Sequence, residues 1–481
     1  MIDQSSRIRV ECADRVATLR FGEAALSRRL LRELDQALRS LERSRAADVL
    51  ILRAAGPDRF PSGPDLDEYQ SLIDDESRRR FAYLGQSVFD RLEQLSTVMP
   101  TIAFIEGECT NAGLELALAC DFRLAVARPE TRLGFNALGN GLMPCWGATQ
   151  RLPRLIGYRR AEVMLVGNRI LTARAAKSIG LVDHAFGPKP AKTELNWFVA
   201  DVQDRGRRAN RQHGRRGWRL RLREHPGWFR PGPAAPNPMA RILGDTMTHG
   251  WRFGIEEGLT AERAAFAADG HHPAGEELRR LARRRQEQAA IWEHVPVPKR
   301  IGIYGGENRA IELAVIALHA GEAVALFDAN ADLRGAIAQR MKQALRQAVT
   351  DGRFTMLEAE QKFKAFRITS CFDSYDLVLL TGPDSAQVEA LIELDRRLPA
   401  EVGLVVTSPT INLGPLARGL RHGSRLLGAH FPSGESVIAP IELVATRLTA
   451  ERQLARLFRW LAHAGFTANT PETDISRTAA A

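Results

Sequence analysis

The residues best suited to chemistry lie between Glu108 and Arg151. A turn of small residues leads there into a predicted helix whose first turn carries a carboxylate, Glu115. Backbone N–H groups at the start of a helix favour negative charge, so they can stabilise a developing oxyanion. A carboxylate beside them can donate or accept a proton. The alternative is a structural one, since an acid in the first turn also stabilises the helix dipole.

The elements that would hold this stretch precede it in the chain. Residues Ile8–Leu19 alternate between polar and apolar, which predicts a strand pair with a turn at Ala13-Asp14. Leucines at helical spacing predict a helix over Leu26–Arg45. A buried strand, a loop, a second helix and the strand at Thr101–Gly107 then lead to the candidate site.

Length and composition indicate a soluble protein with more than one domain. The chain has 481 residues, of which 44% are hydrophobic and 26% charged, so two or three domains are expected. No signal peptide and no run of about 18 apolar residues occurs, so we expect a cytoplasmic protein. Five scattered cysteines without a CxxC pair predict neither disulfides nor a metal site.

Positive charge is concentrated between residues 201 and 230, a segment that contains ten arginines and only three acids. Tryptophans lie among the arginines, and such a mixture could bind the backbone of a nucleic acid. It could also attract the phosphates of a nucleotide cofactor, or form a solvated linker. We predict a basic linker and helical connector over residues 191–297.

A second pattern begins at residue 300, where a strand, a tight turn, a helix and a strand are predicted in succession. This order is typical of a dinucleotide-binding βαβ unit. The cofactor-binding positions are Gly305, Gly306, Ala310 and Asp328, the last at the spacing from which an acid reaches the ribose hydroxyls. Glu307 replaces the second glycine of the fingerprint and brings negative charge to the pyrophosphate, so NAD is possible but doubtful.

Three motifs of the N-terminal half together resemble a known family. They are FPSGPDL at residues 60–66, GLELALACDFRLA at 113–125 and TQRLPRLIG at 149–157. This succession is similar to the enoyl-CoA hydratase (crotonase) superfamily. The resemblance implies an α/β fold, with a ββα spiral domain over residues 1–190 that binds a coenzyme A thioester.

The resemblance also implies roles for single residues. Glu115 matches the first catalytic glutamate and Ala112 an oxyanion donor, and the substrate-binding positions are Gly63, Asp65 and Gly113. The second oxyanion donor falls on Pro64, which has no N–H. The second catalytic glutamate falls on Ala137. Loss of a donor costs about 10²–10³ in rate, and loss of an acid or base about 10²–10⁴.

The C-terminal half resembles the 3-hydroxyacyl-CoA dehydrogenase family. The resemblance is carried by YDLVLLTGPD, LPAEVGLVVTSPTINLGPLA and RLLGAHFPSGESVIAPIELV, in that order. It implies a Rossmann-like, doubly wound NAD-binding domain over residues 298–481. His430 matches the catalytic base and Glu442 the buried carboxylate that orients it, although the two could instead form a structural pair.

Two further features of that family differ in this sequence. The substrate-binding serine falls on Ile411, with Thr410 or Asn412 as the available substitutes. The helical C-terminal domain of the family has no counterpart before Ala481.

Residues 237–266 are similar to the helical connector in the α-subunits of fatty-acid oxidation complexes, so the whole chain resembles a shortened subunit of that kind. Three functions follow as hypotheses. The first is an acyl-CoA β-oxidation enzyme of hydratase and dehydrogenase character, and the second a catalytically impaired acyl-CoA-binding scaffold. The third is a nucleic-acid-associated protein. Besides acyl-CoA, a homo-oligomer or a β-oxidation partner subunit is expected.

Overall fold

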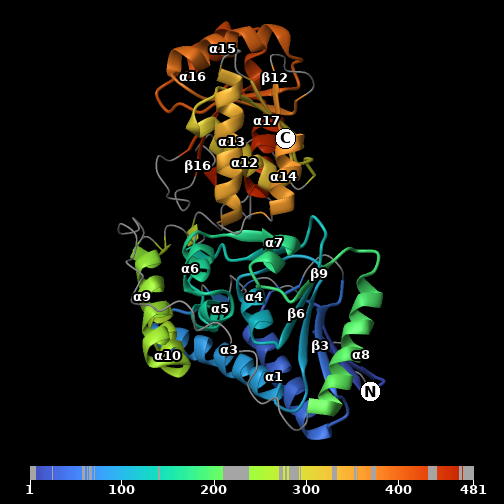
Figure 1. The fold of residues 1–481 in the computed structure, drawn as a ribbon. Coiled ribbons are helices and arrows are strands. Elements are labelled where there is room, and N and C mark those ends of the chain that lie inside the picture. Colours follow the sequence, from blue (N-terminus) through green and yellow to red (C-terminus); the bar gives the residue numbers. More distant parts are fainter. Residues whose placement is uncertain are drawn as a thin grey trace. The chain divides into compact units, whose positions relative to one another are not determined.

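The protein is described here from a computed structural model, in which the chain forms two compact units, Met1–Arg279 and Arg280–Ala481 (Figure 1). Each unit is considered by itself. The structure describes residues 7–469 except 24, 57–59, 62, 64–67, 70, 139–140, 210–237, 270–274, 277–278, 281–291, 293, 328–332, 351–353, 355, 370–374, 432–440 and 465–467.

A six-stranded sheet forms the centre of the first unit. Its order is β1 (Ile8–Ala13), β2 (Val16–Phe21), β3 (Val49–Ala54), β4 (Thr101–Ile105), β6 (Phe122–Val126) and β9 (His184–Phe186). Strands β1 and β2 are an antiparallel hairpin, and every later pair is parallel. The hairpin turn contains Asp14 and Arg15, both at positive φ, one position later than the sequence predicts.

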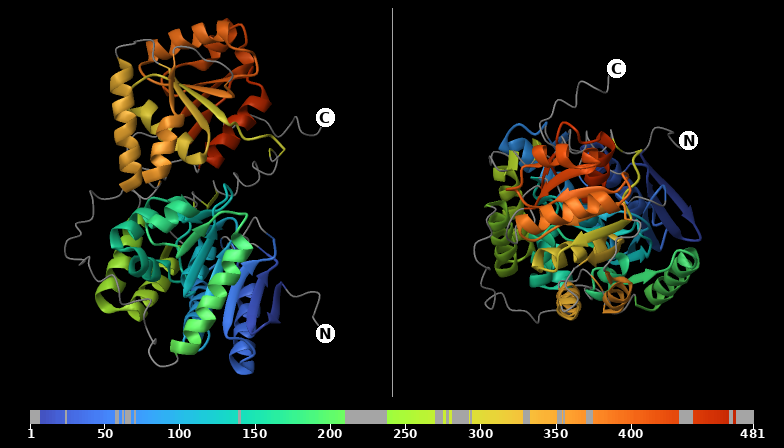
Figure 2. Two further views of the ribbon diagram at one scale, coloured as in Figure 1. Left: turned by 45° about the vertical axis from the view of Figure 1, so that its right-hand side comes forward. Right: turned by 90° about the horizontal axis from the view of Figure 1, so that it is seen from above.

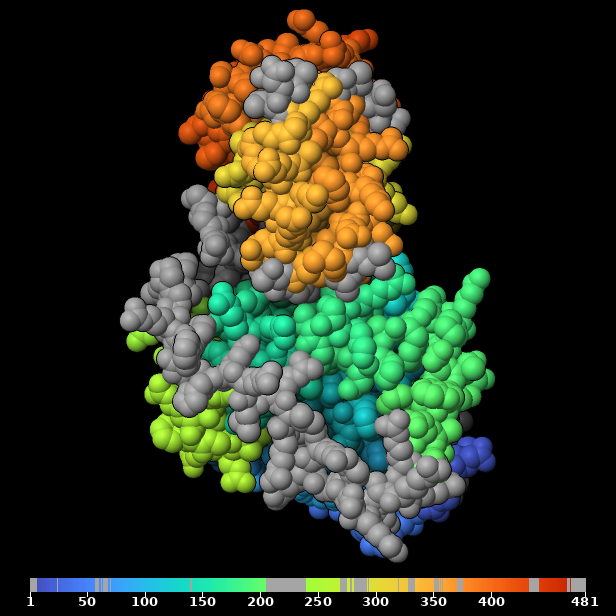
Figure 3. All heavy atoms as spheres, in the orientation of Figure 1, coloured from blue at the N-terminus to red at the C-terminus, as the bar shows by residue number. Residues whose placement is uncertain are grey.

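The strands of the parallel region are buried on both faces of the sheet. Helix α8 (Ala191–Ala209) covers one of these two faces (Figure 2). Its apolar side chains pack on those of β3, β4 and β6. The outer side of α8 lies at the surface, where Trp197 is exposed (Figure 3). Helices α1 (Arg28–Ser44) and α3 (Asp75–Leu95) pack on each other elsewhere in the unit.

Short elements follow β4 and carry the candidate site. A small sheet joins β5 (Cys109–Thr110), β7 (Arg132–Gly134) and β8 (Ile170–Thr172). The helices are α4 (Ala112–Leu118), α5 (Ala148–Ile156), α6 (Tyr158–Val166) and α7 (Ala173–Ser178). Helix α4 is buried along its whole length, so its first turn is held rigidly inside the unit.

Helices α9 (Pro238–Phe253) and α10 (Ile255–Asp269), from the expected connector, belong to the first unit and pack against α5. They approach each other closely at two glycines. A Cβ atom on Gly258 would lie 2.7 Å from the Cα of Gly250 and would overlap the amide of Gln150. Gln150 itself donates to the carbonyl of Thr246 at 3.3 Å.

The second unit contains a twisted eight-stranded sheet. Its order is β12 (Arg367–Thr369), β11 (Ala323–Phe327), β10 (Arg300–Tyr304), β13 (Leu377–Leu380), β14 (Gly403–Val406), β15 (Leu426–His430), β16 (Ile441–Val444) and β17 (Ala468–Asn469). The first six are parallel and run 3-2-1-4-5-6 in their own numbering. This is the order of doubly wound dinucleotide folds. The predicted fold class is confirmed for this unit.

Alternate residues of the central strands are apolar on both faces of the sheet, so helices cover both faces. Leu377 and Leu379 of β13 belong to one apolar cluster, with α12 (Asn308–Ala320), α13 (Leu333–Thr350) and α17 (Glu451–His463). Val378 and Leu380 belong to the other, with α15 (Asp384–Arg397) and α16 (Leu413–Gly419). Helix α14 (Met356–Ala365) packs beside α13.

Among the described residues, no helix is long and apolar enough to cross a membrane.

The close approach of α9 and α10 gives a test of the packing. Replacing a helical glycine by alanine usually stabilises a helix by about 0.5–1 kcal/mol. Gly258→Ala should instead destabilise the first unit by about 1–3 kcal/mol, because the new methyl group overpacks a buried contact. Urea unfolding followed by tryptophan fluorescence measures the change.

Gly244 of α9 provides the matched control, since a Cβ there meets no atom within 4 Å. Gly244→Ala should stabilise the same transition by the ordinary helix-propensity increment. Equal effects of the two substitutions, in sign and size, would contradict the packing described here.

Candidate functional site

The turn before α4 is built on a strained asparagine. Asn111 has φ 49° and ψ −122°, which a residue with a side chain rarely adopts. Its amide is fixed by Asn136, to which it donates at 2.6 Å, and it accepts from the Asn136 backbone N–H at 2.9 Å. The strain is thus stabilised by a reciprocal pair of hydrogen bonds. Ala112, the first residue of α4, has an N–H without a partner inside the helix.

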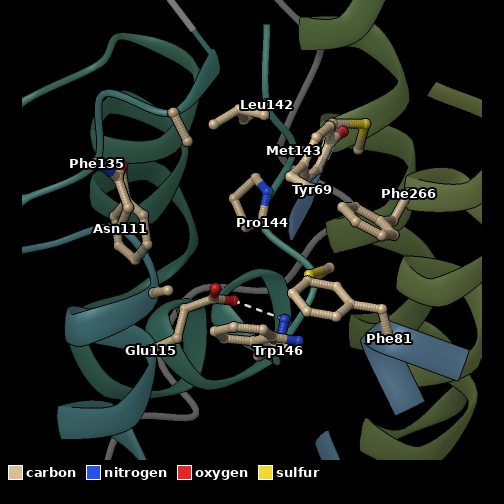
Figure 4. Close-up of a pocket in the computed structure, with 13 residues that line it drawn as sticks. Tyr69, Phe81, Asn111, Glu115, Phe135, Leu142, Met143, Pro144, Trp146 and Phe266 are labelled. Carbon is tan, nitrogen blue, oxygen red and sulfur yellow. Dashed lines mark hydrogen bonds between the residues drawn. The ribbon is translucent and has the colours of Figure 1, made fainter. Parts of the chain in front are cut away.

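Glu115 lies three residues further on and is 3% exposed. Its Oε1 atom accepts from the backbone N–H groups of Trp146 at 2.9 Å and Ala148 at 3.0 Å. The other carboxylate oxygen points into a pocket (Figure 4). One oxygen is therefore anchored and the other is available, which is the arrangement that a general acid or base requires.

A second carboxylate, Glu262 of α10, is bound to the same segment of chain. It accepts from the backbone N–H groups of Gly147 at 2.6 Å and Thr149 at 3.1 Å. It also accepts from the hydroxyl of Thr149 and from Nε2 of Gln86, the latter at 3.1 Å. Glu262 is fully buried. Two glutamates thus cap the N-terminus of α5, where four successive N–H groups would otherwise be unpaired.

Burial and proximity alter the acidity of both carboxyl groups. Burial, followed by the negative charge of Glu262, raises the pKa of Glu115 to about 8, against the backbone hydrogen bonds that lower it. Burial also raises the pKa of Glu262, although its hydrogen bonds to Thr149 and Gln86 oppose this. Glu115 is therefore mostly protonated at neutral pH.

The pocket above Glu115 is mostly apolar. Its lining consists of Tyr69, Phe81, Asn111, Ala112, Glu115, Phe135, Ala137, Leu142, Met143, Pro144, Cys145, Trp146 and Phe266. Phe266 comes from α10, and its ring packs edge-on against Tyr69 at 5.4 Å between centroids. Among these described residues Glu115 is the only carboxylate.

Of the remaining predicted residues of the first unit, some line the pocket, some lie outside its lining and some are not described. Ala137 does line the pocket, and Gly113 is buried in α4. Gly63 has φ 109°, and its carbonyl accepts from the N–H of Leu26 at 2.9 Å. Pro64 and Asp65 lie outside the described residues.

Three other acids near the site do not line the pocket. Glu106 forms an ion pair with Arg53. Glu108 is exposed and accepts from the hydroxyl of Thr110 at 2.9 Å. Glu130 is also exposed, and none of the three lines the pocket.

In the second unit a turn with a glycine at positive φ follows β10, at the positions predicted to bind phosphate. Gly305 has φ 122°, and Ala310 is buried on α12, whereas Asp328 lies outside the described residues. The carboxylate of Glu307 lies directly over Gly305, where an added Cβ would be 2.8 Å from its Oε2. Its Oε1 is buried without a hydrogen-bond partner among the described residues. A phosphate placed over Gly305 would overlap this carboxylate and would be repelled by its negative charge.

His430 and Glu442 are directly opposite each other on the antiparallel strands β15 and β16. Nδ1 of His430 lies 3.8 Å from Oε2 of Glu442, which is beyond hydrogen-bonding distance. The Glu442 side chain is 75% exposed, so the expected burial of this carboxylate is wrong. Its neighbours Ile441 and Leu443 are buried, so the Glu442 side chain lies on the opposite, exposed face of β16.

The two substitutes considered for the serine position already have structural roles. The hydroxyl of Thr410 donates to Asp384 at 2.5 Å, and that of Ser408 donates to the same carboxylate. Asn412 caps α16 by accepting from the N–H of Gly414 at 3.2 Å. Ile411 packs against an apolar cluster.

The geometry defines a protein class: a carboxylate-bearing turn over an apolar pocket, joined in one chain to a doubly wound dinucleotide fold. Comparison with known families agrees. Residues 15–197 match the family model for enoyl-CoA hydratase/isomerase, and residues 301–468 match that for the 3-hydroxyacyl-CoA dehydrogenase NAD-binding domain. The first unit is thus similar to the enoyl-CoA hydratase/isomerase family, and the second to the NAD-binding domain of 3-hydroxyacyl-CoA dehydrogenases. Together they indicate a function of the fatty-acid β-oxidation type.

Several solved structures are similar to parts of this chain. One is DspI of Pseudomonas aeruginosa, 28% identical over 44% of this chain and 87% of its own, with a TM-score of 0.40. Another is an enoyl-CoA hydratase of Bacillus anthracis, 26% identical over 60% of this chain and 97% of its own, with a TM-score of 0.39. A third is FadB2 of M. tuberculosis, 23% identical over 37% of this chain and 64% of its own, with a TM-score of 0.35.

Glu262 is the residue of the site that the sequence analysis did not single out. It lies between Leu259 and Phe266 at helical spacing, so it is an acid on an otherwise buried apolar face. An acid at a position where the helical pattern predicts an apolar residue could have marked Glu262 as a candidate site residue. Its partners, however, are contributed by α5 and α3, far away in the sequence.

The raised pKa of Glu115 predicts how stability depends on pH. In the unfolded chain a glutamate titrates near 4.3, so between that value and about 8 the folded state binds a proton that the unfolded state lacks. This contribution to stability is complete at low pH and is lost as the pH rises to about 8. Urea midpoints of the first unit should therefore fall more steeply over this range in the wild type than in Glu115→Gln. The exposed Glu108→Gln is the control, and a wild-type slope in both variants would refute the assignment.

Proposed function

We propose that the protein binds an acyl-CoA thioester in the pocket of the first unit and transfers protons on it through Glu115. The observation that carries this proposal is the two-sided environment of Glu115, with one oxygen anchored by backbone N–H groups and the other facing the pocket. The N–H of Ala112, at the start of α4, is placed to stabilise a thioester oxyanion.

The chemistry follows from a single carboxyl group. Adding water to an enoyl thioester places oxygen on the β-carbon and a proton on the α-carbon. With Ala137 in the second acid position, Glu115 has to donate the proton to carbon and recover one from water. A carboxyl group with a pKa of about 8 is mostly in the donor form at neutral pH.

The second candidate is an acyl-CoA-binding scaffold with little turnover. The apolar side chain of Ala137 in the pocket favours it, since two carboxylates usually divide the work of hydration in this family. Both candidates predict thioester binding, and they differ in turnover.

Hydration of crotonyl-CoA, followed by loss of absorbance of the conjugated thioester, distinguishes the two candidates. If the enzyme proposal is correct, Glu115→Gln should lower kcat by about 10²–10⁴, because the proton-transfer group is lost. Glu108→Gln is the control and should retain the wild-type rate. No wild-type turnover, together with thioester binding by calorimetry, would favour the scaffold instead.

In the second unit, the proposal is that Glu307 opposes dinucleotide binding. It is supported by the carboxylate over Gly305 and by the repulsion between like charges, which is worth about 4 kcal/mol at 4 Å near a protein surface. Glu307→Gly should therefore strengthen NAD binding about tenfold or more in a calorimetric titration. Glu312→Ala removes a neighbouring charge from the same helix and should leave the affinity unchanged. Tight NAD binding by the wild type would contradict the proposal.

Four other expectations remain predictions. They are the cytoplasmic location, a homo-oligomer or partner subunit, a dehydrogenase role for His430 and Glu442, and a role for the Arg-rich segment. Residues 210–230 of that segment lie outside the described residues.

A further inference from the structure

We propose that Glu262 is a positioning residue which remains ionised and thereby keeps Glu115 protonated for its work in the pocket. The catalytic consequence rests on the function proposed above. The coupling between the two carboxyl groups is independent of that function and can be measured without turnover.

The two glutamates bind alternate N–H groups of one short segment. Glu115 takes those of Trp146 and Ala148, and Glu262 takes those of Gly147 and Thr149. Each carboxylate therefore fixes the backbone that the other one binds. A movement of Glu262 would release every second donor and change the orientation of Glu115.

Among the described residues, neither carboxylate forms an ion pair with a cation. Arg151 lies close by, since its guanidinium donates to the carbonyl of Trp146, but it is already paired with Asp90 at 2.5 Å and Glu93 at 3.2 Å from α3. Arg263 reaches the site only indirectly, since its guanidinium donates to the amide oxygen of Gln86. Two buried like charges at one helix terminus are unfavourable, so the pair retains one proton.

Hydrogen bonding decides which member of the pair holds that proton. Glu262 accepts from four donors, whereas Glu115 accepts from two. Donors stabilise the ionised form of a carboxylate, so the negative charge is favoured on Glu262 and the proton on Glu115. The remaining titratable neighbour is the buried thiol of Cys145, whose pKa burial and both carboxylates raise, so it stays neutral.

The experiment is a ¹³C NMR titration of the glutamate carboxyl carbons in the full-length protein. The Glu115 resonance is assigned by its absence from Glu115→Gln. In Glu262→Gln the loss of the neighbouring charge should lower the titration midpoint of Glu115 by one pH unit or more. A midpoint unchanged from the wild type would overturn the proposal.

A milder variant covers the case in which Glu262→Gln does not fold. Thr149→Val keeps the shape of the side chain and removes the hydroxyl that donates to Glu262. The proton should then move partly to Glu262, which lowers the midpoint of Glu115 by a smaller amount in the same direction. No change in this variant would equally contradict the proposal.

The matched control is Glu162→Gln. Glu162 lies on α6, and its partial burial raises its pKa to about 7, yet it has no hydrogen bond to the α5 terminus among the described contacts. It should leave the Glu115 midpoint unchanged. A purely structural Glu262 would lower stability in its variants without moving that midpoint.

Activity provides a separate readout. If the wild type hydrates crotonyl-CoA, the pH–rate profiles of Glu262→Gln and Thr149→Val should shift to lower pH in step with the titrations. Failure of the proposed function is the absence of wild-type turnover. Failure of this inference is an unmoved Glu115 midpoint, whether or not turnover occurs.

Discussion

The N-terminus of α5 is the point on which the first unit depends. Four consecutive N–H groups there are bound by two buried carboxylates from helices distant in sequence. Burying an ionised carboxylate such as that of Glu262 costs several kcal/mol, and each hydrogen bond to the charged group offsets about 1.5–3 kcal/mol of this cost. The site is therefore stable only when α4, α5 and α10 are all in place, which connects binding chemistry directly to tertiary packing.

The same constraint explains why the pocket can be apolar and still contain an acid. Aromatic side chains of α3 and α10 exclude water around Glu115, and this raises its affinity for a proton. In a wetter pocket the carboxyl group would ionise in the ordinary range and lose its capacity to donate at neutral pH. Hydrophobic packing and acid–base chemistry are thus two aspects of one arrangement.

Most of the fold was predictable from local pattern. The apolar runs at Leu377–Leu380 and Gly403–Val406 indicate strands buried on both faces, and the doubly wound sheet confirms this. Glu115 was also identifiable, because its role depends on a turn and a helix that are adjacent in the sequence. Glu262 was not, since its partner Gly147 lies 115 positions away and only tertiary packing brings them together. The exposure of Glu442 likewise depends on which face of its strand packs on the core of the second unit.

The extent of the family match and the extent of the folded unit differ. The enoyl-CoA hydratase/isomerase match ends at residue 197, whereas Phe266 of the pocket lining and Glu262, the second cap of α5, lie beyond it. A fragment cut at the family boundary would expose the α5 terminus and open the pocket to water. The unit that packs together is therefore longer than the stretch that matches the family model. Recombination or truncation between residues 197 and 259 would separate α10 from the α3 and α5 helices on which it packs.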